Sequence, residues 1–326
     1  MILFFENFTQ IDAAVIDYRS IRDGGPLFVG HSWMVDATVS GPVEEKEGVV
    51  YDFGAFKKLM KEYCDGTGPD HKTIITLPSA ESDSKFSEHT STSPGRTHTR
   101  VNYGNREHDI TLTVPICREG NPGAAFKVCR DFEAMAVEHA LEVRMCADFA
   151  QFLEEKLPGH QDVKVSFELR KRPTAHNEVE FTYCHGLPAS TSYGCQNILH
   201  GHRSFLRLPE IGDTDSKLKS HLLQLLQKLA GRIHGKYLVN SAHIVGYDGP
   251  NCDEDNMCVS YTSLSRGKFQ LNLPSSDVVV LNNHTTVEHL SAYLSDLIAK
   301  EPEFSALRGH TIFVSEGVSK GAVIRV

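Results

Sequence analysis

Long runs of positive charge are missing from the sequence, and so are long apolar runs. The longest basic run is Arg170–Arg172, and 33 Lys and Arg face 42 Asp and Glu, for a net charge of −9. General nucleic-acid binding needs clustered Lys and Arg, so this class is excluded. No apolar run approaches the roughly 20 residues of a membrane-spanning helix. The opening MILFFENFTQ lacks the charged leader of a signal peptide, so we expect no membrane partner.

The cysteines also lack a pattern. None of the eight forms a Cys-x-x-Cys pair, and spacings such as Cys252 to Cys258 are irregular. We therefore expect reduced thiols in a cytoplasmic protein rather than a disulfide framework. With 40% hydrophobic and 23% charged residues, the composition is that of an ordinary globular protein. Its 326 residues predict two domains or one large one.

Two short motifs occur twice at the same offset. VEH stands at 137–139 and again at 287–289, and LPGH at 157–160 corresponds to LRGH at 307–310. Both pairs are 150 residues apart. A repeat at a constant offset indicates that the chain contains two copies of one unit.

The offset changes within the copies. GHSWMVDATVSG from Gly30 aligns with GHRSFLRLPEIG from Gly201 at an offset of 171, so the first copy carries about 21 extra residues. The polar stretch Ser79–Arg96 is the expected insertion and is predicted to be a mobile loop, because it has little apolar surface to bury. We place the boundary between the copies near Lys171–Asn177.

Hydrophobic periodicity predicts an α+β fold, with antiparallel sheets that carry helices on one face. The predicted units are 1–172 and 173–326, each running strand, strand, helix, strand, strand, helix, strand. The clearest strands are expected at 33–41, 108–116, 163–171, 205–212, 267–274 and 311–320, and the helices at 52–63, 213–233 and 285–300.

Histidines cluster in the second copy, in FTYCHGL and CQNILHGH. In a strand, His200 and His202 would project from one face, and His185 on the preceding strand would complete a three-histidine zinc site. The alternative is that these histidines satisfy hydrogen bonds or face water. Cys195, in a loop just before them, is either a fourth ligand or a proton-transfer group whose thiol the nearby cation activates.

These motifs resemble the 6-pyruvoyltetrahydropterin synthase and 6-carboxytetrahydropterin synthase family. The family signature is an early histidine, then a cysteine shortly before His-Gly-His. In the first copy, the segment from Gly30 and the Asp70-His71 dipeptide in PDHKTIITLP resemble the segments that follow in the family. TTVEHLSAYL, from Thr285, is similar to its helix start, with His289 where Asn is usual. The resemblance covers nearly the whole chain, once per half.

The resemblance implies two tandem tunnelling-fold units that assemble into a barrel, with the chain forming a homo-oligomer. It implies Zn²⁺ on His185, His200 and His202, with Cys195 moving protons along the substrate side chain, helped by Asp70 and His71. The substrate would be a pterin, 7,8-dihydroneopterin triphosphate or a close relative, and the enzyme a carbon-oxygen or carbon-carbon lyase. The carboxylates implied as pterin anchors are Glu316 (slightly preferred), Glu168, Glu288 and Glu138.

The two halves differ in what they retain. Opposite His185, His200 and Cys195, the first half has Asp12, Val29 and Gly24, and only His31 remains, opposite His202. Opposite Asp70-His71, the second half has Ala242-His243. We therefore expect no zinc in the first half, and one composite site per chain where a first half meets a second half.

Two other functions remain open. One is a side-chain aldolase of the same fold that acts on dihydroneopterin, and the other is a non-catalytic protein that binds a pterin or purine. Arg203 follows His-Gly-His where the family has a small or amide residue, so contacts near the metal differ. The sequence leaves the product open.

Overall fold

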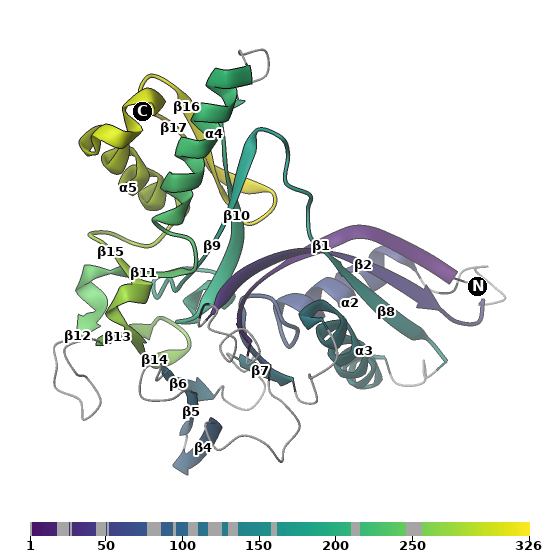
Figure 1. Ribbon diagram of the computed structural model, residues 1–326. Helices are drawn as coiled ribbons and strands as arrows, with labels where there is room; N and C mark the ends of the chain where they lie inside the picture. Colours follow the sequence, from purple (N-terminus) through teal and green to yellow (C-terminus); the bar gives the residue numbers. More distant parts are fainter. Residues whose placement is uncertain are drawn as a thin grey trace.

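The computed structural model describes residues 2–17, 26, 28–43, 50, 52–76, 86–93, 96–103, 110–116, 126–129, 136–157, 162–209, 216–245 and 256–326. Its first sheet has the strand order β7-β3-β1-β2-β8, with α2 (Phe53–Asp65) and α3 (Val137–Lys156) packed together beside it (Figure 1). The strands are β1 (Ile2–Asp17), β2 (Val29–Ser40), β3 (Lys72–Thr76), β7 (Phe126–Cys129) and β8 (Lys164–Arg170).

The second sheet repeats this order and adds one strand, as β15-β11-β9-β10-β16-β17. Its helices are α4 (Ser216–Gly231) and α5 (Val287–Lys300). The strands are β9 (Glu178–His185), β10 (His200–Arg207), β11 (Lys236–Asn240), β15 (Val278–Leu281), β16 (Thr311–Glu316) and β17 (Lys320–Arg325). Equivalent elements follow in the same sequence and the same sheet position, so the predicted α+β fold of two tandem tunnelling-fold units is confirmed.

The sheets are mixed rather than purely antiparallel, which corrects the prediction. In each unit the strand after the first helix pairs in parallel with the unit's first strand, β3 with β1 and β11 with β9. The connection from β1 to β3 passes through β2 and α2, so it is long enough to bring the chain back parallel to β1, whereas a short hairpin is not. Residues 171–177 lie between β8 and β9 and belong to no strand or helix.

A third sheet joins the two halves, in the order β12-β13-β14-β6-β5-β4. Antiparallel pairing of β14 with β6, with Leu271 opposite Leu112, links the second half to the first. Its strands are β4 (Phe86–Ser93), β5 (Arg96–Tyr103), β6 (Ile110–Ile116), β12 (Ile244–Val245), β13 (Asn256–Ser263) and β14 (Gly267–Pro274).

The third sheet corrects the predicted mobile loop at Ser79–Arg96. Residues 86–93 form β4 and Arg96 begins β5, while 79–85 and 94–95 lie outside the described residues. Low hydrophobicity does not by itself exclude a strand. Backbone hydrogen bonds to β5 hold β4 in place, and threonine is favoured in strands.

Each helical layer packs its own core. In the first unit, α3 buries Leu141, Met145 and Phe149 against α2 and the sheet. The Phe149 ring meets Tyr63 of α2 at 5.2 Å and Phe167 of β8 at 5.4 Å between centroids. Aromatic contacts of this kind stabilise the fold by more than the burial of their surface area alone.

Among the described residues, no helix is both long and apolar enough to cross a membrane.

A further core lies where the two units meet. It combines Ala14, Ile16, Phe28 and Ile75 of the first unit with residues of the second that include Cys184, Ile198, Leu199 and Tyr237. In Figure 1, β9 and β10 run beside the ends of β1 and β2 at this junction. The two chain termini lie on opposite sides of this junction (Figure 1). The candidate site residues lie at the junction itself.

Two glycines allow β2 and β10 to approach each other closely. A Cβ built on Gly30 would lie 2.5 Å from the backbone N of His202 and would also collide with the carbonyl of Tyr183. A Cβ on Gly201 would lie 2.7 Å from Cα of Gly30. Only hydrogen fits between these backbones, so both positions need glycine.

Gly30→Ala is therefore expected to lower the free energy of unfolding by about 3 kcal/mol, the upper end for overpacking, because the new methyl group meets rigid backbone. Urea denaturation measures this. Gly231→Ala is the control, since nothing lies within 4 Å of a Cβ there, and it should be neutral or slightly stabilising. Equal stability of the two variants would contradict the close approach.

Candidate active site

Three buried histidines meet on one face of the second sheet. His185 ends β9 and lies directly opposite His200 on β10, and His202 follows two residues later. Because side chains alternate along a strand, His200 and His202 project from the same face. The ring centroids are 4.4 Å (His185–His200), 5.0 Å (His185–His202) and 5.5 Å (His200–His202) apart, and each residue is at most 1% exposed.

The Nδ1 atom of each ring points to an oxygen atom outside the cluster. The three contacts are His185 to the Thr285 hydroxyl at 3.2 Å, His200 to the Asn197 carbonyl at 3.1 Å, and His202 to the Asp12 carboxylate at 3.3 Å. The first two contacts are hydrogen bonds, whereas the third is an ion-pair contact without hydrogen-bond geometry. Oxygen partners of this kind fix the orientation of metal-binding imidazoles and leave Nε2 for the metal.

The Nε2 atoms converge as a metal requires. Those of His185 and His202 are 3.0 Å apart, and Nε2 of His200 is buried with no hydrogen-bond partner among the described residues. Two nitrogens bound tetrahedrally to zinc at 2.0–2.1 Å would be about 3.3 Å apart. Burial, followed by the charge of a neighbouring histidine, lowers the pKa of His185 and of His200 well below the usual value. The rings of His185 and His200 are therefore neutral, as metal-binding imidazoles are. A set of three imidazole nitrogens fits zinc.

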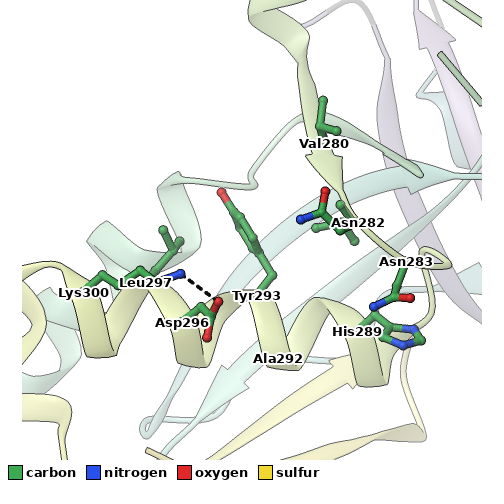
Figure 2. A pocket seen from close by; sticks show the side chains of 10 residues that line it. Val280, Asn282, Asn283, His289, Ala292, Tyr293, Asp296, Leu297 and Lys300 are labelled. Atoms are coloured by element: carbon green, nitrogen blue, oxygen red, sulfur yellow. Dashed lines mark hydrogen bonds and ion pairs between the residues drawn. The ribbon is translucent and has the colours of Figure 1, made fainter. Parts of the chain in front are cut away.

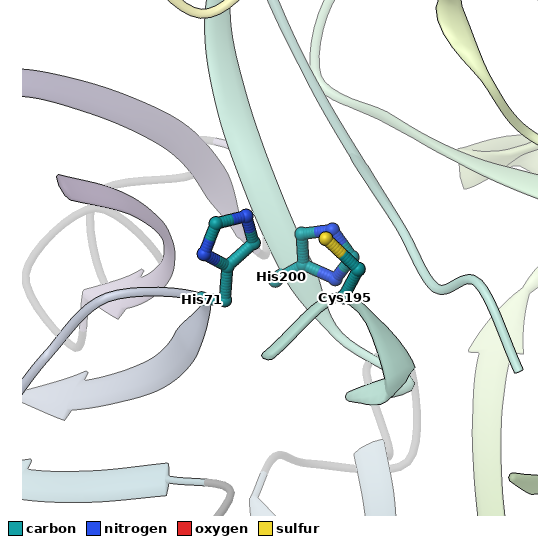
Figure 3. Close-up of side chains that lie close together, drawn as sticks. All are labelled: His71, Cys195 and His200. Atoms are coloured by element: carbon teal, nitrogen blue, oxygen red, sulfur yellow. The ribbon is translucent and has the colours of Figure 1, made fainter. Parts of the chain in front are cut away.

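Cys195 and His71 face this cluster from opposite sides of the junction. Cys195 lies in the 3₁₀ turn Gly194–Gln196, and His71 follows α2 in the first unit. Figure 3 shows both side chains next to His200, and ligand atoms of the three lie within 4.8 Å of one another. A Cβ on Gly194 would lie 2.7 Å from Cβ of His71, so glycine there lets the turn approach His71.

Asp70 completes this group. Its Oδ2 atom lies 2.8 Å from Nδ1 of His71. Burial lowers the pKa of His71, but the charge and hydrogen bond of Asp70 outweigh it, so the pKa lies well above the usual value. Burial raises the pKa of the Cys195 thiol, but the neighbouring His71 lowers it more, and the net shift is downward. The pair therefore favours a thiolate beside an imidazolium.

Backbone contacts hold His71 in an unusual conformation. Its φ of 53° lies in the left-handed region, which residues other than glycine rarely adopt. The backbone N–H of His71 donates to the Asp12 carbonyl at 2.6 Å, and Asn197 donates through Nδ2 to the His71 carbonyl at 3.2 Å. Strain of this kind persists only where the surroundings enforce it, and it concentrates at functional sites.

Of the four candidate anchor carboxylates, only Glu316 lies at the cluster. Its Oε1 is 3.7 Å from Nε2 of His202, and its Oε2 is 3.3 Å from Nζ of Lys320. Glu168 is exposed on β8, opposite Asp36. Glu288 is exposed at the start of α5.

The pocket of Figure 2 lies between β15 and α5 and shares no lining residue with the histidine cluster.

Glu138 is occupied by partners from its own half. Its Oε1 accepts hydrogen bonds from Trp33 Nε1 at 3.1 Å and from Lys171 Nζ at 2.7 Å. Burial raises the pKa of Glu138, but these bonds more than offset it and lower the pKa to about 2. A carboxylate already bonded in this way has little capacity left for a ligand.

At pH 7, Glu138→Gln is expected to lower the free energy of unfolding by about 1–2 kcal/mol, a value discounted for solvent screening. Because the folded pKa is depressed, this contribution is present above pH 4.5 and is lost as pH falls towards 2. Urea denaturation at pH 7 and at pH 3 should show the difference between wild type and variant shrinking. Glu168→Gln, at an exposed position, should differ little from wild type at either pH.

The strand register corrects one equivalence between the halves. β9 and β10 pair His185 with His200, while β1 and β2 pair Val15 with Val29. The counterpart of His185 is therefore Val15, three residues beyond Asp12. Val15 has no ligand atom, so the corrected equivalence adds no histidine to the first half.

Comparisons with known proteins agree with the resemblance. Residues 29–115 match the profile of the family described as 6-pyruvoyl tetrahydropterin synthase. No curated protein matches the chain significantly. A Plasmodium vivax 6-pyruvoyl tetrahydropterin synthase is 19% identical and matches 45% of this chain and 95% of its own, with a TM-score of 0.31. The Plasmodium falciparum enzyme is 18% identical over the same shares, with a TM-score of 0.32. The profile match thus relates residues 29–115, within the first half of the chain, to the 6-pyruvoyl tetrahydropterin synthase family.

Proposed function

We propose that this protein is a zinc-dependent pterin lyase of the 6-pyruvoyl/6-carboxytetrahydropterin synthase type, acting on 7,8-dihydroneopterin triphosphate or a close relative. One observation carries the proposal. A convergent set of three histidine Nε2 atoms in the second unit lies beside a Cys195–His71 pair that spans both units. A purely structural zinc site would not need this second group.

In the proposed mechanism, His185, His200 and His202 hold the zinc ion. Bound there, zinc would polarise oxygen atoms of the substrate side chain and so acidify the adjacent C–H bonds. Every other step uses side chains of this protein.

Cys195 is the proposed base, because His71 favours its thiolate. It would take a proton from the substrate side chain, and His71 would return a proton from the opposite side of the junction. Asp70 keeps Nδ1 of His71 protonated and the ring oriented, as a carboxylate does for a catalytic imidazole.

Glu316 is the proposed anchor for the pterin. A carboxylate accepts hydrogen bonds from the 2-amino and ring N–H groups of a pterin in a bidentate pairing. Its position beside His202 and Lys320 would place the ring within reach of the metal. Glu168, Glu288 and Glu138 lie elsewhere or are already bonded.

We further propose that the chain forms a homo-oligomer. The first sheet ends in β7 and β8, the second in β15 and β17, and the third in β12 and β4, so six strand edges are open within the described residues. Open edges offer unpaired backbone groups to a neighbour, and closing sheets into a barrel removes them.

The test is product analysis by mass spectrometry after incubating the zinc-loaded protein with 7,8-dihydroneopterin triphosphate. The proposal expects loss of triphosphate and a side chain at position 6 that is either shortened or oxidised, with the dihydropterin ring reduced to the tetrahydropterin level by the two electrons that the side chain loses. The dephosphorylated pterin is the second substrate to test. Release of a two-carbon aldehyde from that compound alone would instead identify an aldolase, and tight binding without turnover a pterin-binding protein.

A further inference from the structure

A carboxylate of the first unit lies directly behind the histidine cluster of the second. Asp12, on β1, places Oδ1 3.3 Å from Nδ1 of His202, and it is only 6% exposed. His202 itself is 1% exposed. The resemblance to known synthases draws attention to the histidines, the cysteine and the Asp70-His71 pair, but it assigns nothing to Asp12.

The surroundings of Asp12 hold it in this position. A buried carboxylate is costly unless it is well bonded. The hydroxyl of Ser32, across from Asp12 on β2, donates to Oδ1, and the Ser32 hydroxyl in turn accepts from the backbone N–H of Arg203 at 3.1 Å. Arg203 follows His202 directly in β10, so these hydrogen bonds connect Asp12 to the strand that carries His200 and His202.

The β16–β17 turn closes over the same carboxylate. Gly317 in that turn has a φ of 66°, and a Cβ there would lie 2.8 Å from Oδ1 of Asp12. Glycine is therefore required twice over at this position, for its backbone conformation and for the space beside Asp12.

Asp12 is also bonded to the proton-transfer group. Its backbone N–H donates to Oδ1 of Asp70 at 2.9 Å, and its carbonyl accepts from the backbone N–H of His71 at 2.6 Å. One residue of β1 thus contacts both the histidine cluster, through its side chain, and the Asp70-His71 pair, through its backbone.

We propose that Asp12 is the positioning residue that holds His202 for zinc across the boundary between the units. This inference rests on the metal part of the proposed function and extends it. The metal site then depends on both halves, with three ligands from the second unit and the orienting carboxylate from the first. A carboxylate behind a metal-binding imidazole fixes its tautomer and raises its basicity.

The test measures zinc affinity by competition with a chromophoric chelator, using the full chain. Asp12→Asn keeps the size of the side chain but removes its charge, so zinc should bind about 10–100-fold more weakly. Asp36→Asn is the matched control. Asp36 is also buried (3% exposed) in the same strand pair, but it binds Arg170, so that variant should keep wild-type zinc affinity.

Comparison with a ligand variant separates positioning from ligation. His202→Ala should abolish stoichiometric zinc binding, whereas Asp12→Asn should weaken it and still reach one zinc per chain at saturating metal. If Asp12→Asn fails to fold, Ser32→Ala takes its place and should weaken zinc binding severalfold in the same direction. Wild-type affinity in the variant would overturn the inference and leave the proposed function standing. A wild-type protein that binds no zinc would overturn the metal site itself.

Discussion

Replacement of His185 by alanine is expected to abolish stoichiometric zinc binding. His185 supplies one of three converging Nε2 atoms, and it is fully buried opposite His200. Two imidazoles rarely hold a catalytic zinc ion, which takes three protein ligands. Since a metal contributes several kcal/mol to the transition state, turnover of the pterin should fall by at least about 10³-fold.

Elemental analysis after dialysis measures the metal, and a stopped assay measures turnover. His31→Ala is the control, because His31 is the first-half counterpart of His202, and its ring is stacked on that of Trp33 with 4.7 Å between the centroids. That variant should keep the wild-type zinc content. Full zinc content in the His185 variant would show that the ligand assignment is wrong.

Cys195→Ala and His71→Ala should each lower kcat by about 10²–10⁴-fold while zinc stays bound, because general acid–base groups contribute on that scale. The two side chains interact across the junction, so they should act as a unit. The double variant should then be little worse than either single one, since catalytic groups that work together are strongly non-additive.

Steady-state kinetics of the three variants, with zinc content measured in each, checks this prediction. Cys146→Ala is the matched thiol control, because Cys146 lies on α3 away from the cluster and is partly buried like Cys195. It should have wild-type activity. Losses that simply multiply in the double variant would mean that Cys195 and His71 serve separate steps.

Much of the second-half site could be predicted because it follows from local geometry. Alternation along a strand is enough to place His200 and His202 on one face. His185 could be added because two consecutive strands usually pair. By contrast, the approach of His71 to Cys195 depends on contacts between segments about 120 residues apart in the 326-residue chain, and only the family resemblance indicated it.

Asp12 escaped sequence reasoning for a physical reason. Its role depends on the register of β1 against β2 and on the packing of β1 against β10, and neither leaves a periodic signal. The partners of Glu138 leave no local signal either, because Trp33 and Lys171 lie far from it along the sequence.

Zinc counted per chain by elemental analysis of the purified, untreated protein tests the central claim most directly. The account predicts one zinc per chain, held by the second-half histidines beside the Cys195–His71 pair. Two zinc ions per chain would mean that the first half also binds metal and that the halves have not diverged as described. A protein without zinc that also fails to take it up on addition would contradict the account.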